Sequence, residues 1–288
     1  MPVVEGKARV ALKNILFPTD FSERSAAALP YAAAVARRYQ AKVYLAHVVM
    51  MEPAVAPAAG PPVSDWKMAE QEMAILDRCD LLNGIPYETL VEEGEIGDVL
   101  SEMIRQREID LIILGTHGRG GFKKLILGSV AEEIIREAPC PVLAVGPEVP
   151  SRAQFPGDMR HILCATDFGP GSLTALEYAV SFAEENRARL TIVHIVEPYN
   201  PLLAPKSRED AFQQLLPADV VLASPPEFVV KIGSAAEVIL ELAGDKQSDL
   251  IVMGAHETPV GALSTRLVWP TLHRILCEAR SPVLTVRG

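Results

Sequence analysis

The glycine-rich segment between residues 115 and 129 holds the residues of this sequence that are best suited to bind a ligand. Gly115 is followed after two residues by Gly118, and after nine more residues by Gly128 and Ser129. Glycines allow backbone N–H groups to approach an anion closely, and a helix that starts at Ser129 presents free N–H groups and the positive end of its dipole. Basic residues lie between the glycines. The pattern therefore predicts a site for a phosphate chain.

Other interpretations of this segment stay open on the residues alone. A glycine-rich loop after a strand can be a simple turn, and Ser129 with Glu132 forms a capping box that would serve only to start the helix. The segment is not a Walker A motif, because no Gly-Lys-Ser or Gly-Lys-Thr follows. Lys123 occupies the third glycine position of a dinucleotide fingerprint. Spacing by itself leaves anion binding and a structural turn as alternatives.

The other polar residues predict no metal centre and no catalytic group. Histidines recur in matching positions, His47 with His194 and His117 with His256, and we expect them to be structural residues at strand ends. Asp20 is one carboxylate without a placed partner, so a structural role or a ligand contact is expected rather than activation of water. The four cysteines are too far apart in the sequence to form a CxxC pair. We therefore expect a protein that is not an enzyme.

Composition excludes several classes of partner. The net charge of −10 and the pI of about 5.2 argue against nucleic acid and acidic membranes, because binding to phosphates requires a basic surface. Residues 1–10 have scattered charges and no apolar core of a signal peptide, and the low-charge run at 26–36 is far shorter than the roughly 20 residues of a membrane span. The cysteine pattern fits a reducing compartment. We expect a cytoplasmic protein.

The chain contains one domain twice. Three blocks of the first copy align in the same order with blocks of the second: 14–49 with 161–196, 109–117 with 248–256, and 140–145 with 281–286. The repeat is far longer than a solenoid unit, so it is interpreted as a duplicated domain. Residues 146–158 are rich in proline and glycine, as linkers are. We expect domains at 1–150 and 151–288.

Strands that alternate with helices predict an α/β fold. In the first copy we expect strands at 14–17, 42–49, 87–92, 110–114 and 141–145, and helices at 22–38 (kinked at Pro30), 64–82, 96–106 and 129–137. This alternation predicts two tandem doubly wound domains, each a five-stranded parallel sheet in the order 3-2-1-4-5 with helices on both faces. Ligands of such folds bind where the strand order reverses, here between the strands that precede Asp20 and Gly115.

The last strand of each copy is an apolar edge strand, at 142–145 and at 283–286. Exposed apolar edges invite pairing. A tandem chain can satisfy both edges by pairing them with each other in a pseudo-twofold arrangement, and homodimerisation of the chain is a further expectation.

The glycine spacing, together with the upstream Pro18-Thr-Asp-Phe-Ser, resembles the universal stress protein family, and the resemblance covers nearly the whole chain as a tandem of two domains. Members with this glycine motif typically bind ATP, and members without it typically do not. The resemblance implies that Asp20 and Val48 contact the adenine end of ATP. It assigns the ribose and phosphates to Gly115, Gly118, Gly128 and Ser129, with His117 and Val130 beside them and with Pro18, Thr19 and Leu114 completing the site. Magnesium would arrive on the nucleotide phosphates.

The second copy departs from this motif. Glu257 stands at the position of Gly118, and Trp269 and Pro270 stand at the positions of the Gly-Ser pair. The carboxylate would repel a phosphate, the tryptophan would fill its space, and proline lacks a donor N–H. We therefore expect an ATP-binding stress-response regulator that holds nucleotide in its first domain. A slow ATPase and a nucleotide-independent scaffold or chaperone-like protein are the alternatives.

Overall fold

The computed structural model describes residues 10–50, 65–116, 127–150, 159–196, 215–216, 220–255 and 265–287. The strands of the first half are β1 (Asn14–Pro18), β2 (Lys42–Val49), β3 (Tyr87–Glu93), β4 (Leu111–Gly115) and β5 (Val142–Val145). Its helices are α1 (Glu23–Ala26), α2 (Leu29–Tyr39), α3 (Asp65–Leu76), the 3-10 helix η1 (Asp80–Leu82), α4 (Ile96–Gln106) and α5 (Ser129–Glu137).

The second half repeats the order of the strands. Its strands are β6 (His161–Ala165), β7 (Arg189–Val196), β8 (Glu227–Ile232), β9 (Leu250–Ala255) and β10 (Val283–Arg287). Its described helices are α6 (Pro170–Asn186), α8 (Ala235–Asp245) and α9 (Thr265–Glu278). No helix within the described ranges is both long enough and apolar enough to cross a membrane.

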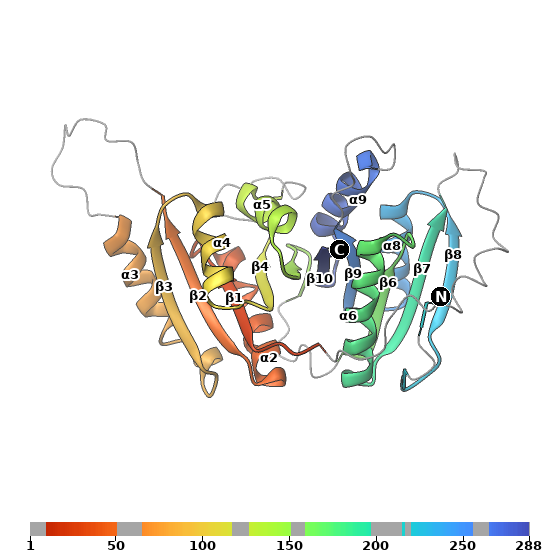
Figure 1. Ribbon diagram of the computed structural model, residues 1–288, viewed down its shortest axis with the longest axis horizontal. Coiled ribbons are helices and arrows are strands. Elements are labelled where there is room, and N and C mark those ends of the chain that lie inside the picture. Colours follow the sequence, from red (N-terminus) through yellow and green to blue (C-terminus); the bar gives the residue numbers. More distant parts are fainter. Residues whose placement is uncertain are drawn as a thin grey trace.

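The ten strands of the described ranges form one continuous sheet, in the order β3-β2-β1-β4-β5-β10-β9-β6-β7-β8 (Figure 1). Each half is parallel, and its strands follow the order 3-2-1-4-5 that the sequence predicts. The halves meet where β5 and β10 pair in antiparallel register, with Leu284 opposite Leu143. The Thr285 hydroxyl adds a hydrogen bond of 3.2 Å to the carbonyl oxygen of Val142. The predicted pairing of the two apolar edges within the chain is therefore confirmed.

Helices cover both faces of the sheet because its strands are apolar on both sides. Along β1, Ile15 and Phe17 pack into one hydrophobic cluster and Leu16 into the other, as the alternation of side chains along a strand requires. The first cluster includes residues of α2, α3 and α6, and the second includes residues of α4, α5, α8 and α9. Each cluster runs through both halves, so the sheet and its two cores are shared.

A half-buried carboxylate fixes the start of β1 beside the start of β4. Asp110 Oδ2 accepts hydrogen bonds from the backbone N–H groups of Lys13, at 2.8 Å, and Asn14, at 2.9 Å. Asp249 makes the equivalent pair of bonds in the second half. Asp110 and Asp249, which align in the two copies, therefore have a structural role. They lie at the amino ends of the strands, whereas the predicted ligand site lies at the carboxyl ends.

Two helix predictions are wrong in detail. The helix predicted at 22–38 is two helices, α1 and α2, and Pro30 is the second residue of α2, where its missing N–H removes no helical hydrogen bond. The second copy has Glu177 at this position and a continuous α6. The helix predicted at 64–82 ends at Leu76, and Met68, expected on its apolar face, is 53% exposed.

Candidate functional site

The predicted crevice lies at the carboxyl ends of β1 and β4, which are neighbours in the sheet. Pro18 ends β1, and the N–H of Thr19 continues the ladder with a hydrogen bond of 2.8 Å to the carbonyl oxygen of Ala46 on β2. Leu114 and Gly115 end β4, and Leu114 is buried. The parallel register therefore brings the predicted residues of both strand ends to one edge of the sheet.

The loop after β1 is held by its own side chains. Phe21 adopts a left-handed conformation, with φ of 61°, and its N–H donates to Thr19 Oγ1 at 3.0 Å. Asp20 Oδ1 accepts from both the N–H of Ser22, at 3.0 Å, and its hydroxyl, at 2.6 Å. The hydroxyl of Ser22 in turn caps α1, as predicted, by accepting from the N–H of Ser25. Asp20 is thus positioned by the turn that starts the helix.

His47 supports the same loop from β2. Its Nδ1 lies 2.7 Å from the carbonyl oxygen of Thr19, and its ring packs against Phe21 with centroids 4.4 Å apart. A carbonyl oxygen only accepts, so Nδ1 carries the proton in this contact. His194 makes the same contact in the second half, at 2.7 Å. The structural role predicted for this histidine pair is confirmed, whereas His117 and His256 lie outside the described residues.

Gly115 has a packing role that sequence reasoning missed. A Cβ at this position would lie 2.6 Å from the carbonyl oxygen of Arg24, so the backbone of α1 requires a glycine at the end of β4. Gly254 is in the same situation, because its Cβ would lie 2.7 Å from the backbone of Gly171. The recurrence of glycine at this position in both copies could have indicated the packing role.

The start of α5 completes the described part of the site. Gly128 is the N-cap, with φ of −64° and ψ of 141°, and its N–H donates to the carbonyl oxygen of Thr116 at 2.9 Å. The capping box predicted for Ser129 and Glu132 is therefore wrong, because Ser129 is the first helical residue and makes no side-chain cap. Ser129 is exposed. The N–H groups of the first turn point out of the helix without intrahelical partners.

The remaining predicted residues fall into two groups. Val48, on β2, and Val130, in the first turn of α5, are half-buried and pack against the same hydrophobic cluster. Gly118 and His117 lie outside the described residues. The structure thus brings together two strand ends, one neighbouring strand and one helix start, and leaves the centre of the glycine loop undescribed.

The second half differs at the position of this helix start. Helix α9 already begins at Thr265, so Trp269 and Pro270, which align with Gly128 and Ser129, lie inside it. The guanidinium of Arg136, on α5, lies 3.9 Å from the centroid of the Trp269 ring. This tryptophan therefore helps to join the two halves, and no helix N-terminus is present at the equivalent position.

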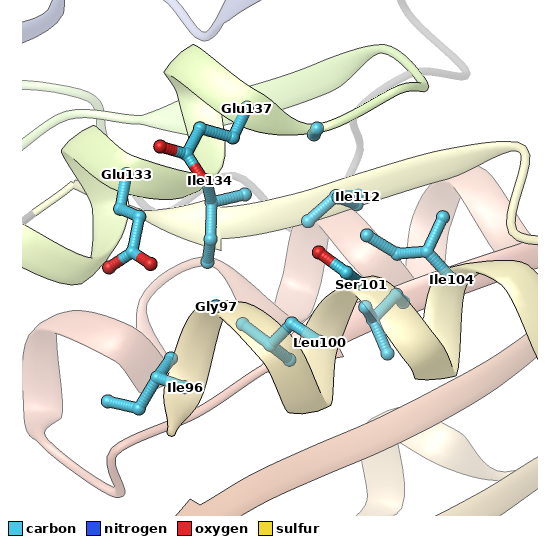
Figure 2. Close-up of a pocket in the computed structure, with 11 residues that line it drawn as sticks. Ile96, Gly97, Leu100, Ser101, Ile104, Ile112, Glu133, Ile134 and Glu137 are labelled. Carbon is cyan, nitrogen blue, oxygen red and sulfur yellow. The ribbon is translucent and has the colours of Figure 1, made fainter.

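A groove lies elsewhere in the first half, between α4 and α5 (Figure 2). We call it the α4–α5 groove, and it is lined by Leu16, Ile96, Gly97, Leu100, Ser101, Ile104, Ile112, Glu133, Ile134, Glu137 and Ala138. Figure 2 shows that the carboxylate of Glu133 extends from α5 toward Gly97 at the start of α4. None of the predicted site residues lines this groove.

Three buried or half-buried groups outside the predicted site have shifted pKa values. Burial raises the pKa of the Cys164 thiol to about 12, and burial together with the charge of Asp110 does the same for Cys140. These thiols are therefore not activated nucleophiles. Burial, with the charges of Arg189 and Lys246, lowers the pKa of His161 to about 4. In the described ranges, no cluster of three or more His, Cys, Asp or Glu residues could hold a metal ion.

Comparison with known proteins gives consistent matches over both halves. A model of the universal stress protein family matches residues 11–146 and 159–287. A universal stress protein of Methanocaldococcus jannaschii is 35% identical over 138 residues, which are 46% of this chain and 81% of that protein. The crystal structure of a universal stress protein from Archaeoglobus fulgidus aligns with 95% of this chain and 98% of its own, at 20% identity and a TM-score of 0.71. A universal stress protein in complex with cAMP aligns with 47% of this chain and 97% of its own, at 23% identity and a TM-score of 0.36.

Proposed function

This chain belongs to the universal stress protein family as a tandem of two domains, and on that premise we propose that its first domain binds ATP in the crevice between β1 and β4. We place the domain boundary between residues 150 and 151. The second domain keeps the fold and does not bind nucleotide in this way.

The observation that carries the proposal is the geometry of the start of α5. The hydrogen bond from Gly128 to Thr116 fixes the helix start to the end of β4, and Ser129 is exposed there. The N–H groups of Ser129, Val130 and Ala131 have no intrahelical acceptors. Together with the positive end of the helix dipole, they suit a phosphate group.

The rest of the proposed site extends from this phosphate-binding end. In the proposal, the ribose and phosphates are held by Gly115 and Gly118, with His117 beside them. Any magnesium is bound by the phosphates. Asp20 and Val48 contact the adenine. Pro18, Thr19 and Leu114 shape the floor of the crevice at the two strand ends.

The difference between the two halves supports one site per chain. In the second domain, α9 continues past the position where α5 starts, and Pro270 stands at the position of Ser129. Proline lacks the N–H that a phosphate needs, and Glu257, at the position of Gly118, adds negative charge. A phosphate would therefore lose donors and meet repulsion in this domain.

Isothermal titration calorimetry with ATP tests the proposal. The wild-type chain should bind one ATP per chain, and Gly118→Glu, which introduces the residue of the second domain, should abolish binding. The matched control Glu257→Gly changes the equivalent position of the second domain and should leave ATP binding unchanged. Two equivalent sites in the wild type, or unchanged binding by Gly118→Glu, would refute the assignment.

In this proposal the bound nucleotide regulates the affinity of the protein for a partner, and the protein is not an enzyme. The competing slow ATPase predicts release of inorganic phosphate that disappears in Asp20→Asn while ATP binding remains. The competing scaffold function predicts that the purified protein carries no adenine nucleotide absorbing at 260 nm and binds none in the titration.

A further inference from the structure

The second domain holds the end of α5, the helix whose start carries the proposed phosphate-binding amides. The guanidinium of Arg136 lies 3.9 Å from the centroid of the Trp269 ring, where α5 and α9 lie side by side (Figure 1). Arg136 Nε also bonds Glu132 Oε1 at 3.1 Å, one turn earlier in α5, and this ion pair orients the guanidinium. The carbonyl oxygen of Glu137 accepts from Arg287 Nη1, on β10, at 3.0 Å. The end of α5 is therefore bound to two elements of the second domain.

A pseudo-twofold axis relates the two halves at the centre of the sheet. Leu143, on β5, lies opposite Leu284, on β10, and these residues are equivalent in the alignment of the two copies. The pairing is thus self-complementary, as in an isologous interface, where each contact is matched by a contact between the equivalent residues. The contact that α9 makes at the end of α5 therefore has a counterpart at the start of α5.

The counterpart involves a thiol of the second domain. The same alignment equates Trp269 with Gly128, the N-cap of α5. It equates Arg136 with Cys277, in the last turn of α9, so the axis places Cys277 beside Gly128. Leu127, the residue before Gly128, is buried in the same hydrophobic cluster as Cys277. Burial raises the pKa of the Cys277 thiol, and the backbone N–H of Leu127 opposes this rise, as an N–H that faces the sulfur would.

Helices α5 and α9 thus lie antiparallel, and the second domain supports α5 at both ends. The contacts of Arg136 with Trp269 and of Leu127 with Cys277 are called the α5–α9 contact below. At its start, α5 is also fixed to its own sheet by the hydrogen bond of 2.9 Å from the N–H of Gly128 to the carbonyl oxygen of Thr116. The apparent affinity of a ligand rises with the fraction of molecules in the competent state, so every contact that holds α5 in this position favours ATP binding.

We infer that the second domain regulates the nucleotide site of the first, because the α5–α9 contact couples ATP binding at the start of α5 to the environment of Trp269. This inference rests on the proposed ATP site and gives the diverged domain a role that needs no nucleotide of its own. Coupling is reciprocal, so the contact raises the affinity for ATP, and ATP strengthens the contact. Trp269 is a positioning residue, since it acts through α5 and contacts the end opposite to Ser129.

Calorimetric titration with ATP tests the effect of the contact on affinity. Trp269→Ala should raise the dissociation constant about twofold to fivefold, the factor that corresponds to loss of a cation–π contact. Trp269→Phe keeps an aromatic face for Arg136 and should restore most of the affinity. The control Cys164→Ala shortens a fully buried side chain of β6, in the core of the same domain, and should lower stability without changing the affinity. Equal affinity of wild type and Trp269→Ala, or an equal loss in Cys164→Ala, would overturn the inference.

Tryptophan fluorescence tests the reverse direction of the coupling in a variant that keeps the contact. The chain has two tryptophans, and Trp66 is exposed on α3, so Trp66→Phe leaves Trp269 as the single reporter without disturbing the core. ATP should change the emission of Trp269 saturably, with a midpoint equal to the calorimetric dissociation constant. Adenosine, which lacks the phosphates, should not change it. In the double variant Trp66→Phe/Arg136→Met, which lacks the guanidinium, ATP should have no effect beyond its own absorption.

The wild-type titration separates failure of this inference from failure of the proposed function. A wild type that binds no ATP would refute the proposed site and the coupling together. A wild type that binds ATP while the emission of Trp269 stays constant, changes equally with adenosine, or changes equally without the guanidinium would refute the coupling alone.

Discussion

Replacing Ser129 by proline should weaken ATP binding without unfolding the first domain. Ser129 is the first residue of α5, a position that proline occupies readily because its N–H has no intrahelical partner. The preceding residue, Gly128, has φ of −64° and ψ of 141°, which is the extended conformation that a residue before proline prefers. Its hydrogen bond to Thr116 does not involve Ser129. The substitution therefore removes one N–H donor and leaves the local backbone in place.

The expected loss follows from the nature of that donor. A hydrogen bond from a backbone N–H to a phosphate oxygen involves a charged acceptor, and such bonds contribute about 1.5–3 kcal/mol. The dissociation constant for ATP should therefore rise by about tenfold to more than a hundredfold. The control Ser129→Ala keeps the N–H and removes only the hydroxyl, so its loss should be smaller.

Calorimetric titration of the two variants, with thermal unfolding of each, separates the alternatives. If Ser129→Pro is folded and binds ATP as the wild type does, the amides of α5 are not phosphate donors, and the proposed site is wrong. If Ser129→Ala loses as much affinity as Ser129→Pro, the hydroxyl and not the backbone holds the phosphate.

Other predictions concern stability and reactivity. Gly115→Ala should lower the free energy of unfolding by about 1–3 kcal/mol, because its Cβ would lie 2.6 Å from a carbonyl oxygen of α1. In the control Gly244→Ala, the new Cβ would have nothing within 4 Å, so the free energy of unfolding should not fall in this way. Equal unfolding midpoints of the two variants in urea would contradict the packing role of Gly115. The pKa of His161, lowered to about 4 by burial, means that the unfolded chain binds a proton between pH 6.5 and 4 that the folded chain does not. The free energy of unfolding should fall by at most about 3 kcal/mol as the pH drops through that window. His161→Asn introduces the residue of the first half, and its free energy of unfolding in urea should depend less on pH than that of the wild type. Cys140 and Cys164, with pKa values of about 12, should resist alkylation by iodoacetamide at pH 8 in the folded protein, as read by mass spectrometry; rapid labelling of either would show that it is accessible as a thiolate.

Much of the fold follows from the sequence because its main signals are local. The buried run at 111–114 and its counterpart at 250–253 are apolar throughout, which is typical of a parallel strand covered on both faces. The α4 helix has a strong apolar periodicity, and its predicted bounds are those observed. Ends of elements were harder to predict. Nothing in the sequence around Pro30 distinguishes a kinked helix from two helices, because both satisfy the same apolar pattern.

The candidate site was less accessible to sequence reasoning, because its contacts join residues that are distant in the chain. The packing of Gly115 against Arg24 and the hydrogen bond of His47 to Thr19 depend on the placement of three elements at once. The spacing of Ser129 and Glu132 allowed a capping box as one interpretation, whereas Gly128 is the N-cap of α5, with its N–H bonded to Thr116. Tertiary contacts outweighed the local preference at that residue.

Comparison of the two halves separates residues that the fold requires from residues that a ligand would require. Asp20 illustrates the difference. Its carboxylate accepts from Ser22 at the start of α1, and Asp167 likewise accepts from the N–H of Gly169, at 2.8 Å, and from the hydroxyl of Ser172, at 2.7 Å. The second half retains this aspartate although Pro270, inside α9, stands at the position of Ser129, the first residue of α5.

The recurrence of Asp20 as Asp167 is therefore explained by the turn after β1 and β6 and needs no nucleotide. Positions such as Ser129, which is Pro270 in the second half, have no such shared contact, and the two copies differ there. The specificity of the first domain for a polyanion should accordingly depend on the start of α5 more than on Asp20. Asp20→Asn should keep the hydrogen bonds from Ser22, because the amide oxygen also accepts. If this variant lost ATP affinity as completely as Gly118→Glu, the aspartate would have a direct role in binding that the second half does not preserve.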